Sequence, residues 1–388
     1  MSRICIVSEF NPLHNGHVYL LNKARELGAE SVTCIMSGNA TQRGELAIID
    51  KYCRAEAAVR LGADLVLELP YPWCASSAEY FAAAAVSLVY PFGDVLLFGS
   101  ECGDIELLKR AATVCDSDEF KAEYESRVSD GEATAAAYVA CLEKRGISKL
   151  SSNDLLGVAY IRAIYKLGVP LKPITVKRLG AAYNEKDEVE GALQSATALR
   201  GMLASGDTEK LGSYAPDAMV QKLIEGAREG IITDASAIDT AALSFFRLTE
   251  PSALCDTAEM TDGLENRICS LANSSVSFEE TFAKLRTKRY TDAKLRRAIL
   301  FAMTGVQKRD IRQMPQYTLL LGANENGRAL LAKNRKKKQA NVITKPADAP
   351  KACRQYKLGQ KLDALYGLAR DKRLLSDDFL KRGAYIQK

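Results

Sequence analysis

The only two histidines of the chain, His14 and His17, stand three residues apart in the segment Glu9-Phe-Asn-Pro-Leu-His-Asn-Gly-His. On the first turn of a helix, this spacing would place both imidazoles on one face. Gly16, between them, would let a phosphate approach the backbone with no Cβ in the way. Two imidazoles directed at one phosphorus can stabilise the charge that develops as a leaving group departs. The segment therefore predicts positional and electrostatic catalysis of a transfer at phosphorus.

Other interpretations of the histidine pair have less support. Incidental surface histidines are disfavoured because the rest of the chain contains none. A two-histidine metal site would need further ligands, and no nearby Cys or Asp completes a set, so we predict no protein-bound metal. The patterns GxxxxGK[ST] and GxGxxG are both absent, which leaves a P-loop and a standard dinucleotide fingerprint unsupported.

The elements around the motif alternate between strand and helix, which is typical of a parallel sheet built from βαβ units. Residues 4–10 predict a strand and residues 17–27 a helix, so the motif lies between them. Ligands of such sheets bind at the carboxyl ends of the strands, where a helix N-terminus offers free N–H groups to phosphate. We therefore expect an α/β, Rossmann-like parallel-sheet domain over residues 1–205. Its further strands are predicted at 31–37, 63–69, 94–98 and 171–176, with helices at 50–61, 77–89 and 154–167.

Strand signals nearly vanish beyond residue 206, and helical runs replace them. Residues 206–388 therefore predict a second, mostly helical domain, as expected for a chain longer than the ~250–300 residues at which one core stops growing. A small strand–helix–strand insert is predicted within it, at Tyr317–Leu321, Arg328–Lys333 and Asn341–Thr344.

Charge is distributed unevenly along the chain. Residues 281–388 hold 27 lysines and arginines against 8 acidic residues, whereas the rest of the chain holds 26 basic and 40 acidic residues. An acidic body with a basic C-terminal part favours a polyanionic partner, in particular nucleic acid. A lysine-rich solvated surface is the alternative. The candidate nucleic-acid contacts are Arg289, Arg296, Arg297, Lys333, Arg335, Lys336, Lys337 and Lys338.

The bulk composition is that of a cytoplasmic protein. The N-terminus reads as a strand and not as a signal peptide, and the most apolar run, near Phe81–Val89, falls short of the ~20 residues of a membrane span. The ten cysteines are scattered without CxxC spacing, so we expect reduced thiols.

A second motif, Ser195-Ala-Thr-Ala-Leu-Arg200, could cap a helix and bind phosphates through Ser195, Thr197 and Arg200. With the histidine motif it resembles the HIGH superfamily of nucleotidyltransferases. The whole set of motifs is similar to one family, the bacterial tRNA(Met) cytidine acetate ligases, over nearly the whole chain. The further motifs in family order are Met36-Ser-Gly, Gln42-Arg-Gly-Glu, Leu67-Glu-Leu-Pro-Tyr, Phe98-Gly-Ser-Glu, Ser152-Asn-Asp-Leu-Leu-Gly, Val176-Lys-Arg and Lys288-Arg-Tyr-Thr-Asp.

The resemblance implies an enzyme that joins acetate to ATP, giving acetyl-adenylate, and acetylates the wobble cytidine of elongator tRNA(Met) to N(4)-acetylcytidine. His14, His17 and Arg200 would be catalytic, and Mg²⁺ would accompany the pyrophosphate. Acetate would occupy a small pocket around Met36-Ser37-Gly38. The candidate ATP contacts are Val7, Ser8, Glu9, Phe10, Asn11, Pro12, Leu13, His14, Asn15, Gly16, His17, Val18, Tyr19, Leu20, Gly99, Asn153, Arg178, Ser195 and Thr197.

Two positions depart from the family pattern, since Asn39 and Asn184 stand where family members often have His. For Asn153, an N-cap role is the alternative to a nucleotide contact. Two other functions stay open at this point. One is an adenylyltransferase acting on a small phosphorylated acceptor, and the other is a tRNA-binding protein without catalysis. Oligomeric state is not predicted.

Overall fold

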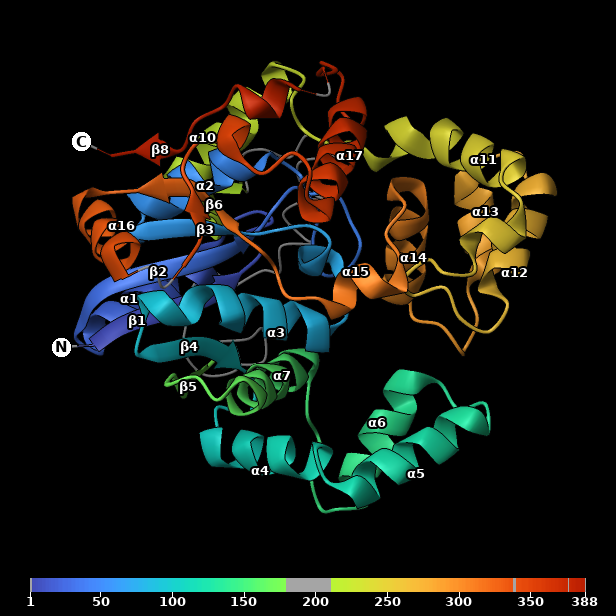
Figure 1. The fold of residues 1–388 in the computed structure, drawn as a ribbon, viewed down its shortest axis with the longest axis horizontal. Coiled ribbons are helices and arrows are strands. Elements are labelled where there is room, and N and C mark those ends of the chain that lie inside the picture. The colour runs from blue at the N-terminus through green and yellow to red at the C-terminus, as the bar shows by residue number, and fades with distance from the viewer. Residues whose placement is uncertain (1, 179–210, 338–339, 376, 388) are drawn as a thin grey trace.

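The structure, a computed structural model, describes residues 2–178, 211–337, 340–375 and 377–387. Within these ranges an eight-stranded sheet runs through the molecule in the order β5-β4-β1-β2-β3-β6-β7, with β8 paired to β6 (Figure 1). β1 to β5 are parallel, so the predicted α/β fold with a parallel sheet is confirmed. The strands are β1 Ser2–Ser8, β2 Ala29–Ser37, β3 Leu65–Leu69, β4 Val95–Ser100, β5 Lys172–Lys177, β6 Thr318–Ala323, β7 Val342–Ile343 and β8 Tyr385–Ile386.

Helices cover both faces of this sheet. α1 (Asn15–Glu26) and α2 (Lys51–Arg60) pack on one face, and α3 (Ala78–Val89) and α7 (Ser152–Leu167) pack on the other. In β1, Ile4 and Ile6 enter the first core while Cys5 and Val7 enter the second. Successive residues of a strand point to opposite faces, so a strand buried on both sides reads as a continuous apolar run.

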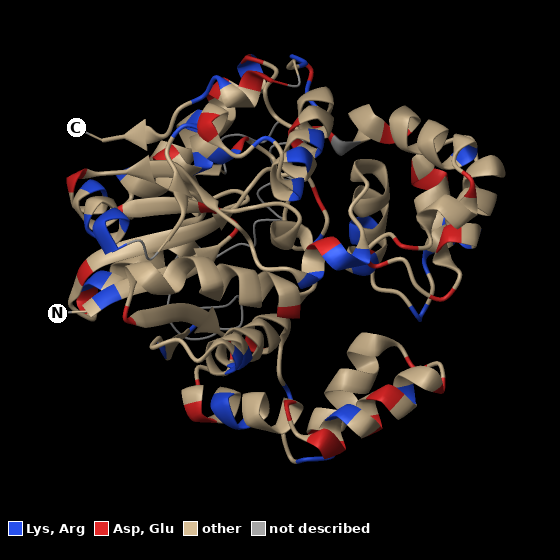
Figure 2. Cartoon of the chain, in the orientation of Figure 1, with Lys and Arg blue, Asp and Glu red and all other residues tan. Residues whose placement is uncertain are grey.

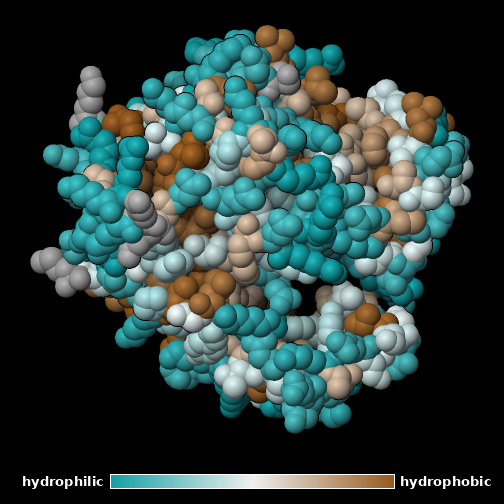
Figure 3. Space-filling view, viewed as in Figure 1, coloured by the Kyte–Doolittle hydropathy of each residue, from teal (hydrophilic) through white to brown (hydrophobic). Residues whose placement is uncertain are grey.

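Two groups of helices project from the sheet. α4 (Ile105–Cys115), α5 (Asp118–Ser129) and α6 (Thr134–Glu143) form one lobe. α11 (Asp239–Leu248), α12 (Leu264–Asn273), α13 (Phe278–Leu285) and α14 (Asp292–Thr304) share a separate apolar core. Figure 3 shows a hollow in the surface between this bundle and the α4–α6 lobe. No helix of the described residues is long and apolar enough to cross a membrane.

The C-terminal part of the chain also contributes to the sheet. β6, α16 (Glu325–Lys337) and β7 are the predicted strand–helix–strand segment, but this segment is not an insert of a separate helical unit. β6 pairs antiparallel with β3, and all six of its residues are buried. An apolar strand is stable only where both of its faces are covered. Pairing with the edge strand β3 places β6 between covered faces. The predicted domain boundary at residue 205 lies outside the described residues and stays a prediction.

The remaining helices connect these parts. α10 (Asp217–Arg228) packs against α2 and against α9 (Leu211–Tyr214). α15 (Lys308–Arg312) follows the bundle, and α17 (Arg354–Leu368) lies between the sheet and the bundle (Figure 1).

Candidate active site at the carboxyl ends of the strands

The two histidines meet where β1 ends and α1 begins. His14 is the N-cap of α1, and its Nδ1 accepts a hydrogen bond from the Gly16 N–H at 3.0 Å. The Nδ1 atom of His17 accepts one from the His14 N–H at 3.2 Å. This reciprocal capping arrangement stacks the two rings with centroids 3.8 Å apart. The predicted juxtaposition is confirmed, although His14 caps the helix and does not belong to its first turn.

These hydrogen bonds define the chemistry that the rings can offer. In a neutral imidazole one nitrogen accepts and the other carries the proton, so each ring presents an Nε2–H donor. Burial, followed by the nearby charge of Arg178, lowers the pKa of His14 to about 4. Burial also holds the pKa of His17 well below its usual range, with further contributions from His14 and Arg178. The pair is therefore neutral near pH 7 and offers two N–H donors, not two cations.

A second group of predicted contacts gathers at the ends of β4 and β5. Arg178 directly follows β5 and lies close to Gly99 of β4. A Cβ added to Gly99 would lie 3.0 Å from the Cγ atom of Arg178. The Asn153 Nδ2 donates to Glu101 Oε1 at 2.6 Å, and Arg178 Nε lies 3.4 Å from the same oxygen. Since Arg178 also acts on both histidines, the two groups share one rim of the sheet.

The N-cap alternative for Asn153 is wrong. Ser151 is the N-cap of α7, and its hydroxyl accepts from the Asp154 N–H. The Asn153 side chain is turned to Glu101, at the same rim as Arg178. Glu101 itself was missed as a candidate, although it stands in the quoted motif Phe98-Gly-Ser-Glu.

Many of the other predicted ATP contacts between Val7 and Leu20 are buried in the loop between β1 and α1. Phe10, Asn11, Pro12 and Leu13 are buried, and the ring of Phe10 meets that of His17 edge-on at 5.0 Å. The other members are distributed along the elements: Val7 and Ser8 end β1, Glu9 follows it, Asn15 and Gly16 open α1, and Val18, Tyr19 and Leu20 continue α1. Ser195, Thr197 and Arg200 lie outside the described residues, as does Asn184.

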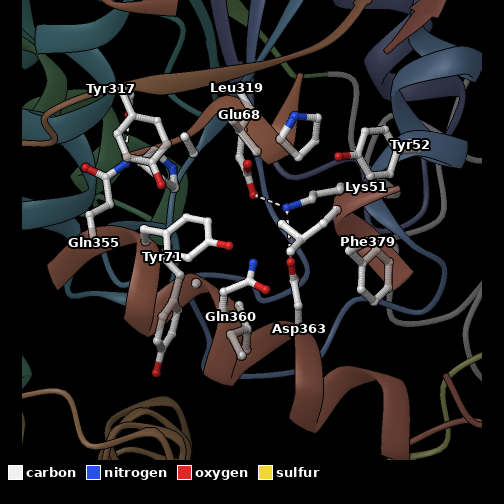
Figure 4. A pocket seen from close by; sticks show the side chains of 17 residues that line it. Lys51, Tyr52, Glu68, Tyr71, Tyr317, Leu319, Gln355, Gln360, Asp363 and Phe379 are labelled. Carbon is white, nitrogen blue, oxygen red and sulfur yellow. Dashed lines mark hydrogen bonds and ion pairs between the residues drawn. The ribbon is translucent and has the colours of Figure 1, made fainter. Parts of the chain in front are cut away.

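A buried ion cluster lies next to this rim (Figure 4). Lys51 Nζ lies 2.8 Å from Glu68 Oε1 and 3.6 Å from Asp363 Oδ2. The Asn39 Nδ2 donates to Asp363 Oδ1 at 2.8 Å, and its Oδ1 accepts from the Lys51 N–H. The cavity beside the cluster measures about 40 Å³. Asn39 therefore ties the rim to α17. The acetate pocket predicted beside it, around Met36-Ser37-Gly38, stays a prediction.

The predicted basic contacts fall into two separated groups. On or just before α14, Arg296 pairs with Glu45 at 2.9 Å, while Arg289 pairs with Asp262. Arg297 is largely buried, pairs with Glu259 at 3.1 Å and donates to the Gln42 carbonyl. These pairings place α14 beside the loop that follows β2, at the carboxyl ends of the strands.

The other group stands at the opposite end of the sheet. Lys333, Arg335, Lys336 and Lys337 lie on the second half of α16, which extends beyond the predicted helix at Arg328–Lys333, and Lys338 lies outside the described residues. Arg3 lowers the pKa of Asp94, just before β4, and the charge of Lys333 adds to this effect. The structure therefore places these cations at the amino ends of the strands and does not join them to α14 (Figure 2).

Comparison with known proteins agrees with this geometry. The family model of the HIGH nucleotidyl transferases matches residues 1–378. The tRNA(Met) cytidine acetate ligase of Acetivibrio thermocellus is 32% identical over 376 residues, covering 91% of this chain and 90% of the relative. That of Caldicellulosiruptor saccharolyticus is 34% identical over 349 residues, covering 88% and 86%.

Solved structures give the same result. The crystal structure of Thermotoga maritima TmcAL bound with alpha-thio ATP superposes with a TM-score of 0.89 at 29% identity, covering 100% of this chain and 99% of that one. Its apo form matches with the same TM-score at 31% identity and full coverage of both chains. The chain belongs to the HIGH nucleotidyltransferases and, within them, to the tRNA(Met) cytidine acetate ligase family.

Proposed function

We propose that this chain activates acetate with ATP and transfers the acetyl group to the wobble cytidine of elongator tRNA(Met). The observation that carries the proposal is the pair of Nε2–H donors on His14 and His17, at the N-terminus of α1 and within reach of the charge of Arg178. The names of the relatives and the ATP analogue bound by the Thermotoga protein support the same reaction.

In the first step an acetate oxygen attacks the α-phosphorus of ATP in line. The P–O bond to pyrophosphate breaks, and acetyl-adenylate forms. Negative charge grows on the phosphoryl oxygens, which the imidazole N–H groups and the positive end of the α1 dipole stabilise. Neutral imidazoles suit this role because they can donate hydrogen bonds to an anion without transferring a proton. We infer that Arg200, with Ser195 and Thr197, binds the departing phosphates.

In the second step the exocyclic amine of the cytidine attacks the acetyl carbon of the adenylate. The C–O bond to AMP breaks, the amine loses a proton, and N(4)-acetylcytidine forms. Acetyl-adenylate reacts with water, so the site must exclude solvent while it waits for the RNA. The buried loop from Phe10 to Leu13 contributes to that exclusion.

Mg²⁺ is proposed as the counterion of the triphosphate, with phosphate oxygens among its ligands. Within the described residues no cluster of three or more His, Cys, Asp or Glu side chains could hold a metal ion, and the imidazoles of His14 and His17 are poor ligands for Mg²⁺. The protein residues proposed here act on the phosphates directly.

The tRNA is proposed to bind through the basic residues of α14 and α16. The reaction is proposed to take place in the cytoplasm, where mature tRNA occurs. Cations that meet phosphates hold RNA without reading its sequence. Arg296 pairs with Glu45 in the loop that follows β2, at the rim that holds the histidines, so the α14 side is the better placed to hold the anticodon arm near the adenylate.

ATP–pyrophosphate exchange, measured with and without acetate, tests the proposal. Acetate-dependent exchange, followed by transfer of labelled acetyl to tRNA(Met), is the expected result. Exchange that needs no acetate but responds to a phosphorylated small acceptor would favour an adenylyltransferase instead. Binding of tRNA without exchange in either condition would favour a non-catalytic RNA-binding protein.

A further inference from the structure

We propose that Arg54 is the positioning residue that holds the histidine loop in its reactive geometry. Arg54 lies on α2 and is fully buried. Its Nη1 donates to the Glu9 carbonyl at 2.6 Å and to the Ser37 carbonyl at 3.1 Å. Its Nη2 donates to the Gly38 carbonyl, and its Nε to the Ile49 carbonyl at 2.9 Å. The inference rests on the proposed function for the reaction that it assists.

These four acceptors come from three segments that meet at the rim. Glu9 follows β1, Ser37 ends β2, Gly38 follows it, and Ile49 precedes α2. A planar guanidinium has five N–H donors in a fixed arrangement, so it can serve several carbonyls at once. All four hydrogen-bond acceptors are neutral carbonyls. Burial lowers the pKa of Arg54, and the nearby carboxylates of Asp50 and Glu9 offset this only in part. Because burying a cation costs stability even when it is partnered, we infer that Arg54 serves the geometry of the rim.

The effect on the histidines passes through the loop from Glu9 to Leu13. Arg54 holds the backbone at Glu9, while the Glu9 carboxylate accepts from the Gln42 N–H at 2.6 Å. The Asn11 Oδ1 accepts from the Ile48 N–H at 2.8 Å. The ring of Phe10, between them, packs edge-on against His17. A shift of the Glu9 backbone therefore changes the position of the stacked imidazoles.

Arg54→Lys tests the proposal, because an ammonium keeps the charge but cannot reach all four carbonyls. A misplacement of about 1 Å can cost roughly 100-fold in rate, so we expect kcat of acetate-dependent exchange to fall by about that factor. The KM for ATP should change only a few-fold. The His14 ring should also gain water contact, so its pKa should rise from about 4 toward 6.5, while Arg178 and His17 still face it.

The two imidazoles can be followed by NMR, since the chain contains two histidines, and the missing signal in His14→Asn assigns the pair. This titration needs neither ATP nor acetate. It therefore separates a failure of the positioning role from a failure of the proposed function, which would appear as absent exchange in the wild-type protein.

Arg25→Lys is the matched control. Arg25 lies in the last turn of α1, where its Nη2 donates to Asp64 at 2.7 Å and to the Gly62 carbonyl at 2.8 Å. The change removes an arginine that anchors the C-terminal end of α1, the helix whose N-terminus carries the histidines. It should lower thermal stability and leave kcat and both histidine titrations as in the wild type.

Arg54→Gln provides a second variant if the lysine form does not fold. Glutamine buries no charge and can still donate to one or two carbonyls, so folding should be less affected. It should give the same fall in kcat and the same rise in the His14 pKa. Wild-type kcat in a folded Arg54 variant would overturn the proposal. So would a fall in kcat with an unchanged His14 titration, because Arg54 would then act on the fold alone.

Discussion

His14 and His17 cap the same helix reciprocally, each accepting at Nδ1 a backbone hydrogen bond from the other's turn. The cap therefore occupies the Nδ1 atom of each ring, and within the described residues the Nε2 atoms make no hydrogen bond. The proposed mechanism assigns both capping and catalysis to these two side chains, so the two contributions must be separated by the choice of substitution.

We expect His14→Ala and His17→Ala to lose roughly 100- to 1000-fold in the rate of pyrophosphate exchange, as for the loss of one preorganised donor. His14→Ala should also lose about 1 kcal/mol of stability with its N-cap. His14→Asn restores a good cap without the Nε2–H donor, so it should regain stability but not activity. Thermal melts and exchange rates of the three variants check this, and wild-type rates in any of them would remove the histidines from the mechanism.

Acid should destabilise the protein through the same pair. The pKa of His14 is lowered by burial from 6.5 to about 4, so between these values the unfolded chain binds more protons than the folded one. The contribution of His14 to the free energy of unfolding is therefore fully present above about pH 6.5. It is lost as the pH falls toward 4, by up to about 3 kcal/mol. Calorimetry at several pH values should show a smaller slope in His14→Asn. An equal slope would contradict the buried neutral state.

Arg178→Ala should weaken ATP binding, because a charge-assisted hydrogen bond contributes roughly 1.5–3 kcal/mol, about 10- to 100-fold in affinity. It should also raise the pKa of both histidines, since the charge of Arg178 lowers them. Lys177→Ala, which removes the neighbouring exposed cation, is the control and should do neither. Calorimetric titration with ATP measures the first effect, and equal losses in the two variants would argue against a specific contact.

The specificity for the carboxylic acid substrate should follow the size of the predicted pocket around Met36, Ser37 and Gly38. One extra methylene in a tight pocket is worth only ~1–3 kcal/mol, so propionate should react more slowly than acetate without being inert. Exchange rates with acetate, propionate and butyrate measure this. Butyrate reacting as fast as acetate would show that the pocket lies elsewhere.

Neutralising Lys333, Arg335, Lys336, Lys337 and Lys338 with glutamine should weaken the binding of many tRNAs alike and flatten its dependence on salt, because fewer counterions are released. Exchange should stay near the wild-type rate, since the cations of α16 stand at the amino ends of the strands, away from the histidines. Lys109, Lys121 and Lys144 of the α4–α6 lobe, changed together, are the control. Unchanged tRNA affinity in the first variant would limit the RNA surface to the side of α14.

Much of the fold and part of the site could be predicted from local sequence. The strands and helices up to residue 177 follow from apolar runs, and the helix ends follow from caps such as Asp50 and Gly168. The histidine motif is local too, since its residues are neighbours in the chain. These signals act over a few residues, which is the range in which backbone geometry and hydrogen bonding couple directly.

The tertiary structure decided every relationship between distant segments. The pairing of β6 with β3, the hydrogen bond of Asn39 to Asp363 across 324 residues, and the contact of Glu101 with Arg178 have no local pattern. In the sequence, Arg54 is an ordinary arginine of a helix, and only the fold brings four carbonyl acceptors to it. Such partners are selected by packing of the whole sheet, because a buried donor is stable only where the fold delivers acceptors to it.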